Sequence, residues 1–194
     1  MCCKLIYMEV GNTFYAKNRN EWRAWLAANF DKEKEIWLIS PSKDSGNARV
    51  EYNDAVEEAL SFGWIDSTVK PYDDQSSAQR YTPRNPRSTY SQANIERLKW
   101  LAREGKLHPS VLPVVDRALK TKFVFPPDII QALKSNKKAW QNYRKFSPSY
   151  QRIRIAYIDG ARKRPQEFKK RLENFIVKTA QNKIIGYGGI DKYY

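Results

Sequence analysis

The sequence has few of the residues from which metal centres and disulfide frameworks are built. Among its 194 residues there is one histidine, His108, and there are two cysteines, the adjacent Cys2 and Cys3. A zinc finger or a histidine-rich metal centre needs several such ligands, so we expect no metal and no other cofactor. Two neighbouring cysteines cannot cross-link distant parts of a chain, and their scarcity is typical of a reduced, cytoplasmic protein.

Long apolar runs are also missing. An apolar run of about 18 residues would indicate a membrane-spanning helix, and the sequence contains none, nor does its N-terminus show the apolar stretch of a signal peptide. Hydrophobic residues nevertheless make up 41% of the chain, which is enough for a folded core. We therefore expect a soluble cytoplasmic protein without a membrane span, and the sequence does not indicate its oligomeric state.

Acidic residues are outnumbered, and the imbalance is local. Lys and Arg total 35 against 21 Asp and Glu, a formal charge of +14, and residues 132–183 alone hold fifteen Lys or Arg against three acids. Such a segment could bind the phosphates of a nucleic acid, with Tyr143, Tyr150 and Tyr157 as stacking partners. The alternative is that these cations simply cover the solvent faces of packed helices.

The pattern of strands and helices predicts an α+β domain over residues 1–122. We expect a hairpin of 5–10 and 13–16, a helix over 21–29 capped by Asn20, a strand over 35–40, a helix over 52–62 stopped by Gly63, a hairpin of 64–70 and 78–82, a helix from Ser91 to Gly105 and a short helix over 108–119. Antiparallel hairpins interspersed with helices favour a small mixed or antiparallel sheet with packed helices.

The second part of the chain, residues 123–194, predicts a basic helical C-terminal region. The segment Phe123–Pro127 is either a linker or an arm that packs its aromatic side chains on a surface, since its two prolines stop regular structure. Helical spacing continues over 128–143, a further helix begins at Ser147-Pro148, and Pro165 breaks or restarts the helix that follows.

Three blocks of residues carry a resemblance to a known family. They read ALSFGWIDS over 59–67, QRYTPRNPRS over 79–88 and YSQANIER over 90–97, and EGKL follows at 104–107. This order resembles the YdeI/OmpD-associated (bacteriocin-protection) family of bacterial proteins, with weaker similarity toward both ends of the chain. The sequence departs from the family's pattern at Ser61, which is often Cys, and at Ser67, where Gly is usual. The resemblance implies a YdhG-like α+β domain followed by helices, a role in stress or bacteriocin protection, and no assigned reaction.

The same blocks contain a candidate ligand-binding site. Strand alternation puts Trp64 and Asp66 on one face of their strand, and Arg80 and Thr82 on one face of the next. If the strands pair, Asp66 could meet Arg80 or Arg84 across the ladder. The full candidate set comprises a wall, anion donors, a helix N-terminus and a loop lysine: Trp64, Asp66, Arg80, Thr82, Arg84, Arg87, Ser91, Asn94 and Lys43.

A structural interpretation of these residues stays open. Asp–Arg pairs often only fix a hairpin, a tryptophan is often core, and Ser91 can serve as a helix cap. Nothing else in the sequence supports an enzyme, and no glycine-rich phosphate loop is present. We therefore expect a protein that binds a small anionic ligand or a partner without catalysis. The alternative is a nucleic-acid-binding protein that uses the basic C-terminal helices.

Overall fold

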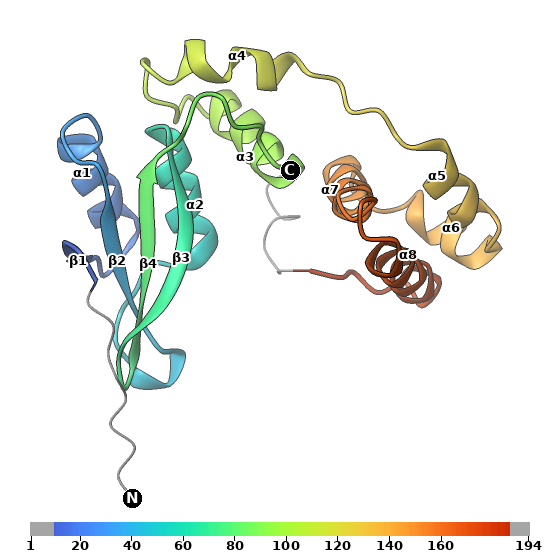
Figure 1. Cartoon of the computed structure of the whole chain (residues 1–194), viewed down its shortest axis with the longest axis horizontal. Coiled ribbons are helices and arrows are strands. Elements are labelled where there is room, and N and C mark those ends of the chain that lie inside the picture. The colour runs from blue at the N-terminus through green and yellow to red at the C-terminus, as the bar shows by residue number, and fades with distance from the viewer. Residues whose placement is uncertain (1–9, 187–194) are drawn as a thin grey trace, which may run out of the picture. The chain divides into compact units, whose positions relative to one another are not determined.

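The computed structural model describes residues 10–186 and divides into two compact units. The N-terminal unit consists of residues 10–88 and 101–116, and the C-terminal unit of residues 89–100 and 117–186 (Figure 1). Each unit is described by itself below. The boundary between residues 122 and 123 that the sequence suggests stays a prediction.

The N-terminal unit is built on a four-stranded mixed sheet, which confirms the α+β class. Its strands are β1 (Thr13–Tyr15), β2 (Ile36–Pro41), β3 (Trp64–Asp73) and β4 (Ser76–Pro83), in the spatial order β1-β2-β4-β3. The predicted β3–β4 hairpin is confirmed, and β4 also pairs antiparallel with β2. The hairpin expected from residues 5–10 and 13–16 stays a prediction, because residues 5–9 lie outside the described residues. Within the described residues, β1 pairs in parallel with β2.

Two helices, α1 (Arg19–Asn29) and α2 (Tyr52–Ser61), pack against this sheet. The shared core contains Trp22 and Leu26 of α1, Ala59 of α2, and Trp64 and Tyr81 of the sheet. In α1 the apolar residues recur at helical spacing, so this helix buries one face and leaves the other to solvent. In α2 every residue from Ala55 to Ser61 is buried. A short turn of 3-10 helix, η1 (Lys43–Ser45), follows β2.

The start of α1 differs from the sequence prediction. Asn18, rather than Asn20, is the cap, because its backbone is extended and its side chain accepts a hydrogen bond from the Glu21 backbone N–H at 3.0 Å. Glu21 reaches back and accepts from the backbone N–H of Lys17 at 2.8 Å. The two side chains thus satisfy backbone donors of Glu21 and Lys17, in a variant of the capping box, and this fixes the first turn two residues earlier.

Glycine ends α2 as predicted. Gly63 has a φ of +74°, which L-residues with a side chain rarely adopt, and it turns the chain from α2 directly into β3. The next two helices are α3 (Gln92–Arg103) and α4 (Leu112–Lys120). Ser91 caps α3 as predicted, since its Oγ accepts from the Asn94 backbone N–H at 3.3 Å.

The C-terminal unit is helical, with α5 (Pro127–Lys134), α6 (Lys137–Tyr143), α7 (Pro148–Asp159) and α8 (Pro165–Ala180). The predicted helix starts at Ser147-Pro148 and Pro165 are confirmed. The helical spacing expected over 128–143 is found, but it is divided between α5 and α6, because Asn136 leaves the helical conformation and its side chain caps α6 by accepting from the Ala139 N–H at 3.0 Å. The core of this unit is formed by Ile129, Leu133, Ala139, Tyr143, Tyr150, Ile155, Ile158 and Phe175.

Candidate functional site

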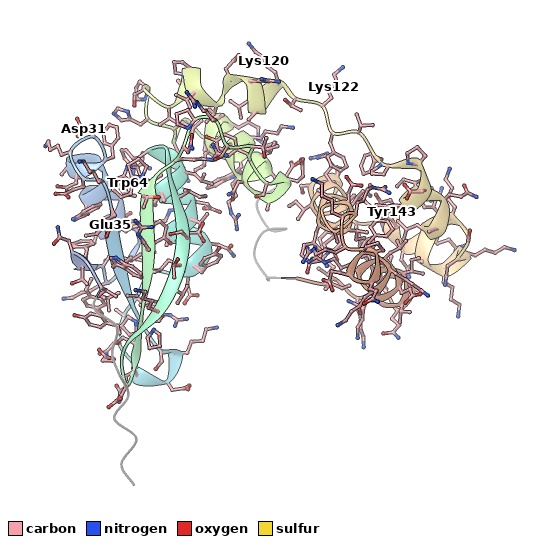
Figure 2. All side chains as sticks on the ribbon, in the orientation of Figure 1. Asp31, Glu35, Trp64, Lys120, Lys122 and Tyr143 are labelled. Atoms are coloured by element: carbon pink, nitrogen blue, oxygen red, sulfur yellow. The ribbon has the colours of Figure 1, made fainter. Side chains whose placement is uncertain are left out.

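Trp64, the predicted wall of a pocket, is a core residue. Its side chain is 1% exposed and its indole Nε1 donates to the backbone carbonyl of Phe30 at 3.0 Å. Its ring meets that of Trp25 edge to face, with 5.9 Å between centroids. Figure 2 marks Trp64 at the start of β3, in the unit that also contains Glu35. The structural interpretation of Trp64 therefore applies.

Asp66 and Arg80 have different partners from those expected. Asp66 lies opposite Tyr81 in the β3–β4 register, and it accepts a hydrogen bond from the Tyr52 hydroxyl at 2.9 Å. Arg80 is the neighbour of Tyr81 on β4, so it points to the opposite face of the sheet. There its Nε donates to Glu35 at 3.0 Å, and this hydrogen bond holds the pKa of Glu35 below its usual value. The predicted Asp66–Arg80 contact is wrong because the register puts the two residues on opposite faces.

The remaining predicted residues are spread over loops and strand ends. Arg84 donates to the backbone carbonyls of Asn85 and Ser88, at 3.1 and 2.7 Å, and so closes its own loop. Thr82 faces Ile65 in the register. Arg87 and Lys43 are exposed, while Ser91 and Asn94 belong to the C-terminal unit. The structure therefore does not gather the nine residues into one pocket, and whether any of them binds an anion stays a prediction.

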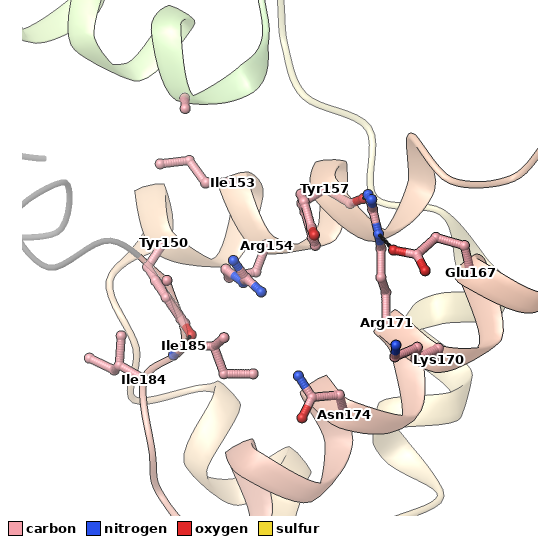
Figure 3. A pocket seen from close by; sticks show the side chains of 12 residues that line it. Tyr150, Ile153, Arg154, Tyr157, Glu167, Lys170, Arg171, Asn174, Ile184 and Ile185 are labelled. Atoms are coloured by element: carbon pink, nitrogen blue, oxygen red, sulfur yellow. Dashed lines mark hydrogen bonds and ion pairs between the residues drawn. The ribbon is translucent and has the colours of Figure 1, made fainter. Parts of the chain in front are cut away.

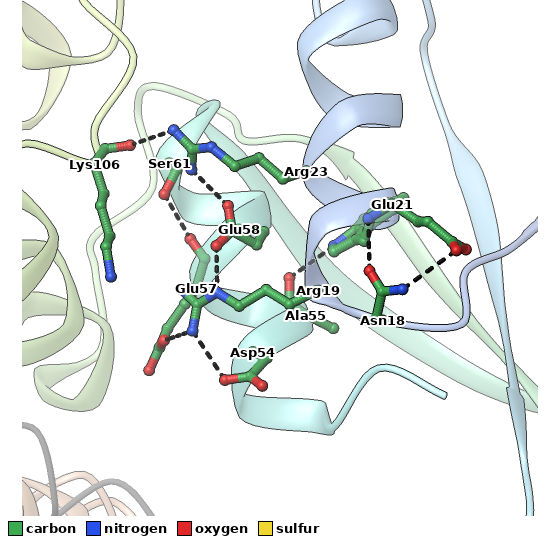
Figure 4. A network of polar contacts seen from close by, with 11 residues as sticks. Asn18, Arg19, Glu21, Arg23, Asp54, Ala55, Glu57, Glu58, Ser61 and Lys106 are labelled. Atoms are coloured by element: carbon green, nitrogen blue, oxygen red, sulfur yellow. Dashed lines mark hydrogen bonds and ion pairs between the residues drawn. The ribbon is translucent and has the colours of Figure 1, made fainter. Parts of the chain in front are cut away.

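The N-terminal unit also contains an ion-pair network that the sequence did not reveal (Figure 4). Arg19 of α1 pairs with Asp54, Glu57 and Glu58 of α2, and Arg23 pairs with Glu58 at 2.6 Å. Glu57 and Glu58 are both buried. Buried carboxylates need such partners, so the network joins α1 to α2.

The C-terminal unit contains a pocket of about 650 Å³ (Figure 3). Its walls are α7, α8 and the segment 184–186, and Ala93 of α3 also lines it. Three cationic side chains, Arg154, Lys170 and Arg171, line this pocket, against one carboxylate, Glu167. The pocket therefore has an excess of positive charge.

Arg154 is the central cation of this pocket. Its Nε is buried and has no hydrogen-bond partner among the described residues. Its Cζ lies 4.9 Å from the centroid of the Tyr157 ring. Burial lowers the pKa of the Arg154 guanidinium, and the positive charge of Arg171 acts in the same direction. An arginine stays protonated even so, and Arg154 is thus a partly buried cation with an unused donor.

Arg171 is held in place beside Arg154. Its Nε donates to Glu167 at 2.6 Å, its Nη1 donates to the backbone carbonyl of Tyr157 at 2.8 Å, and its Cζ lies 3.8 Å from the centroid of the Tyr157 ring. The Tyr157 ring therefore contacts two guanidinium groups. Two cations brought together in this way repel each other, and an anion between them would relieve the repulsion.

The sequence contained part of the signal for this pocket. Tyr150, Arg154 and Tyr157 recur at helical spacing on α7, and Glu167, Lys170, Arg171 and Asn174 recur on α8. Periodicity shows which residues share a face of a helix. It does not show which other helix that face packs against, so the sequence indicated only a basic surface here.

Two family models match the chain in separate regions. Residues 14–114, just over half of the chain, match a domain of unknown function (DUF8412), and residues 122–182 match the family described as bacteriocin-protection, YdeI or OmpD-associated. The chain belongs to the DUF8412 family, whose model covers more than half of it, and its C-terminal part matches the YdeI/OmpD-associated family. No curated protein and no solved structure matches it.

The matched regions refine the resemblance seen in the sequence. The motif blocks over 59–107 lie in the DUF8412 match, whereas the YdeI/OmpD-associated match covers the part of the chain whose similarity was weaker. Arg154, Lys170 and Arg171 all lie within residues 122–182. Within residues 10–186, none of the helices has the length and apolar character needed to cross a bilayer.

Proposed function

We propose that this chain is a binding protein for a small anionic ligand, which it holds between α7 and α8. The observation that carries the proposal is Arg154, a partly buried guanidinium that lines the pocket with a donor lacking a partner among the described residues. An unsatisfied buried donor costs roughly 1–3 kcal/mol. A carboxylate or phosphate in the pocket would supply the acceptor, and the planar guanidinium suits both groups.

The neighbouring groups support binding rather than catalysis. Lys170 and Arg171 add positive charge, and the amide of Asn174 can donate or accept a hydrogen bond. The one carboxylate, Glu167, is already engaged by Arg171, which holds the pKa of Glu167 below its usual value. It is therefore ionised near neutral pH and serves to position Arg171. A cytoplasmic location and a protective role, both expected from the sequence, stay predictions.

Inorganic phosphate is the simplest probe of this site. The thermal midpoint of the protein is measured over a series of phosphate concentrations, at an ionic strength kept constant with sodium chloride. Because a ligand that binds only the folded state stabilises it, the midpoint should rise with phosphate. Arg154→Gln should remove the rise. Arg144→Gln should keep it, because Arg144 is exposed on the same unit and does not line the pocket.

An equal rise of the thermal midpoint with chloride alone, or a full phosphate response in Arg154→Gln, would overturn the proposal.

Nucleic-acid binding by the basic helices is tested in the same preparation. Arg152 and Arg162 already form ion pairs with carboxylates, which leaves fewer cations for the phosphates of a nucleic acid. That alternative is favoured if Arg154→Gln binds single-stranded DNA as tightly as wild type does, and if this binding weakens steeply as the salt concentration rises.

A further inference from the structure

The pocket of the C-terminal unit has two chemically different halves. In Figure 3 the apolar side chains of Ile153, Ile184 and Ile185 lie with the Tyr150 ring on one side. The groups that can bind an anion, Arg154, Lys170, Arg171 and Asn174, lie in the centre and on the other side. A small inorganic anion would occupy only the second half.

We propose that the ligand is an amphipathic organic anion, with a carboxylate or phosphate at Arg154 and an apolar chain or ring against the isoleucines. This inference rests on the anion site proposed above and specifies the rest of its ligand. A pocket of about 650 Å³ is within the range of sites that enclose a whole organic molecule. An inorganic ion would leave water against the apolar wall, whereas an apolar group would displace it.

The apolar half is a fixed feature. The backbone N–H of Ile185 donates to the Tyr150 hydroxyl at 2.8 Å, and this bond ties the segment after α8 to α7. The Tyr150 ring is buried and packs against Phe146 and Phe175 in the core of the unit. The apolar wall is thus attached both to the core of the unit, through the Tyr150 ring, and to the segment after α8, through the Tyr150 hydroxyl.

Ile184 exposes apolar surface that a bound ligand would cover. Its side chain is 55% exposed, although it lines a pocket together with two other isoleucines. An apolar ligand group would remove this surface from water. Each methylene that becomes buried is expected to lower the dissociation constant about fourfold.

The test is a homologous series of anions measured by calorimetric titration of the full chain. The carboxylates are acetate, butanoate, hexanoate and octanoate, and the phosphates are inorganic phosphate and phenyl phosphate. We expect the dissociation constant to fall along the carboxylate series, and phenyl phosphate to bind more tightly than phosphate. The two arms show which anionic group the polar half prefers.

Two variants separate the halves of the site. Ile184→Asn should weaken hexanoate and phenyl phosphate and leave inorganic phosphate unchanged, whereas Arg154→Gln should weaken all of them. Val177→Asn is the matched control, because Val177 is 52% exposed on α8 and does not line the pocket.

Three results would contradict the inference, and they are distinguishable. If phosphate binds but affinity does not increase along the series, the apolar half has no role and only the anion site survives. If octanoate binds equally well to Arg154→Gln, its binding is adventitious and the inference is wrong. If none of the six anions binds, the proposed function itself fails.

Discussion

Arg152 of α7 forms a bidentate ion pair with Glu96 of α3: its Nε and Nη2 each donate to one carboxylate oxygen at 2.7 Å. Both residues belong to the C-terminal unit, and the Glu96 side chain is buried. Arg154, two positions further along the same helix, has no such carboxylate partner among the described residues and lines the pocket instead. One helix therefore carries one arginine that is paired with a buried carboxylate and one that lines a pocket.

The Arg152–Glu96 pair should contribute strongly to the stability of the C-terminal unit. Arg152→Met leaves the buried carboxylate of Glu96 with Gln92 as its remaining hydrogen-bonding side chain, and breaking a buried pair in this way costs about 3–5 kcal/mol. Urea unfolding of wild type, Arg152→Met, Glu96→Gln and the double variant measures the coupling energy. A coupling below about 0.5 kcal/mol, the usual value for an exposed pair, would show that the pair is not formed in solution.

Stability should fall in acid because of the same carboxylate. Burial alone would raise the pKa of Glu96, but hydrogen bonds from Arg152 and Gln92 outweigh burial and hold it below the ordinary 4.5. A depressed folded-state pKa means that the stabilisation is complete above 4.5 and is lost as the pH falls through the lower value. Unfolding free energies from pH 7 to pH 3 should therefore drop more steeply for wild type than for Glu96→Gln. Parallel curves would contradict this assignment.

Trp64 should behave as a core residue and not as a ligand contact. Trp64→Ala removes a fully buried indole and its hydrogen bond to Phe30, so we expect a loss of about 3–5 kcal/mol in unfolding free energy. Trp64→Phe keeps much of the packing and should cost less. The two variants are compared by urea unfolding, and a loss under about 1 kcal/mol for Trp64→Ala would refute the buried placement.

Arg80 should contribute little to either stability or anion binding. Arg80 and its partner Glu35 are each 37% exposed, and such pairs are typically worth below about 1 kcal/mol. Arg80→Ala should therefore unfold close to wild type and keep the full phosphate response, since the proposed pocket lies in the other unit. If a folded Arg80→Ala protein loses the phosphate response, the anion site lies among the residues suggested by the sequence and not in this pocket.

Local signals in the sequence predicted much of the fold. A glycine that must adopt positive φ marks the end of α2 at Gly63, and prolines mark the starts of α7 and α8. The break at Asn136 was missed, because the apolar spacing continues across it and an asparagine alone does not show that it caps a new helix. The parallel pairing of Thr13–Tyr15 with β2 was missed as well, since pairing between distant segments leaves no local signal.

The candidate site was harder to predict than the fold. A register in which Asp66 faces Tyr81 separates Asp66 from Arg80, and the two strand sequences do not fix that register. On α7, the sequence offers two arginines of equal standing, and only the packing shows that Arg152 meets Glu96, 56 residues away, while Arg154 lines a pocket. The resemblance pointed to the family that residues 122–182 match, but it did not indicate which arginine lines a pocket.

The most direct measurement of the central claim follows the Nε–H signal of Arg154 by nuclear magnetic resonance while phenyl phosphate is added. The signal is assigned by its disappearance in Arg154→Lys. Because this Nε is buried without a partner among the described residues, we predict that its resonance shifts and saturates, while that of the exposed Arg144 does not move. An Arg154 signal that stays fixed throughout the titration, or a saturable shift at Arg80 or Arg84 in its place, would contradict an anion-binding pocket between α7 and α8.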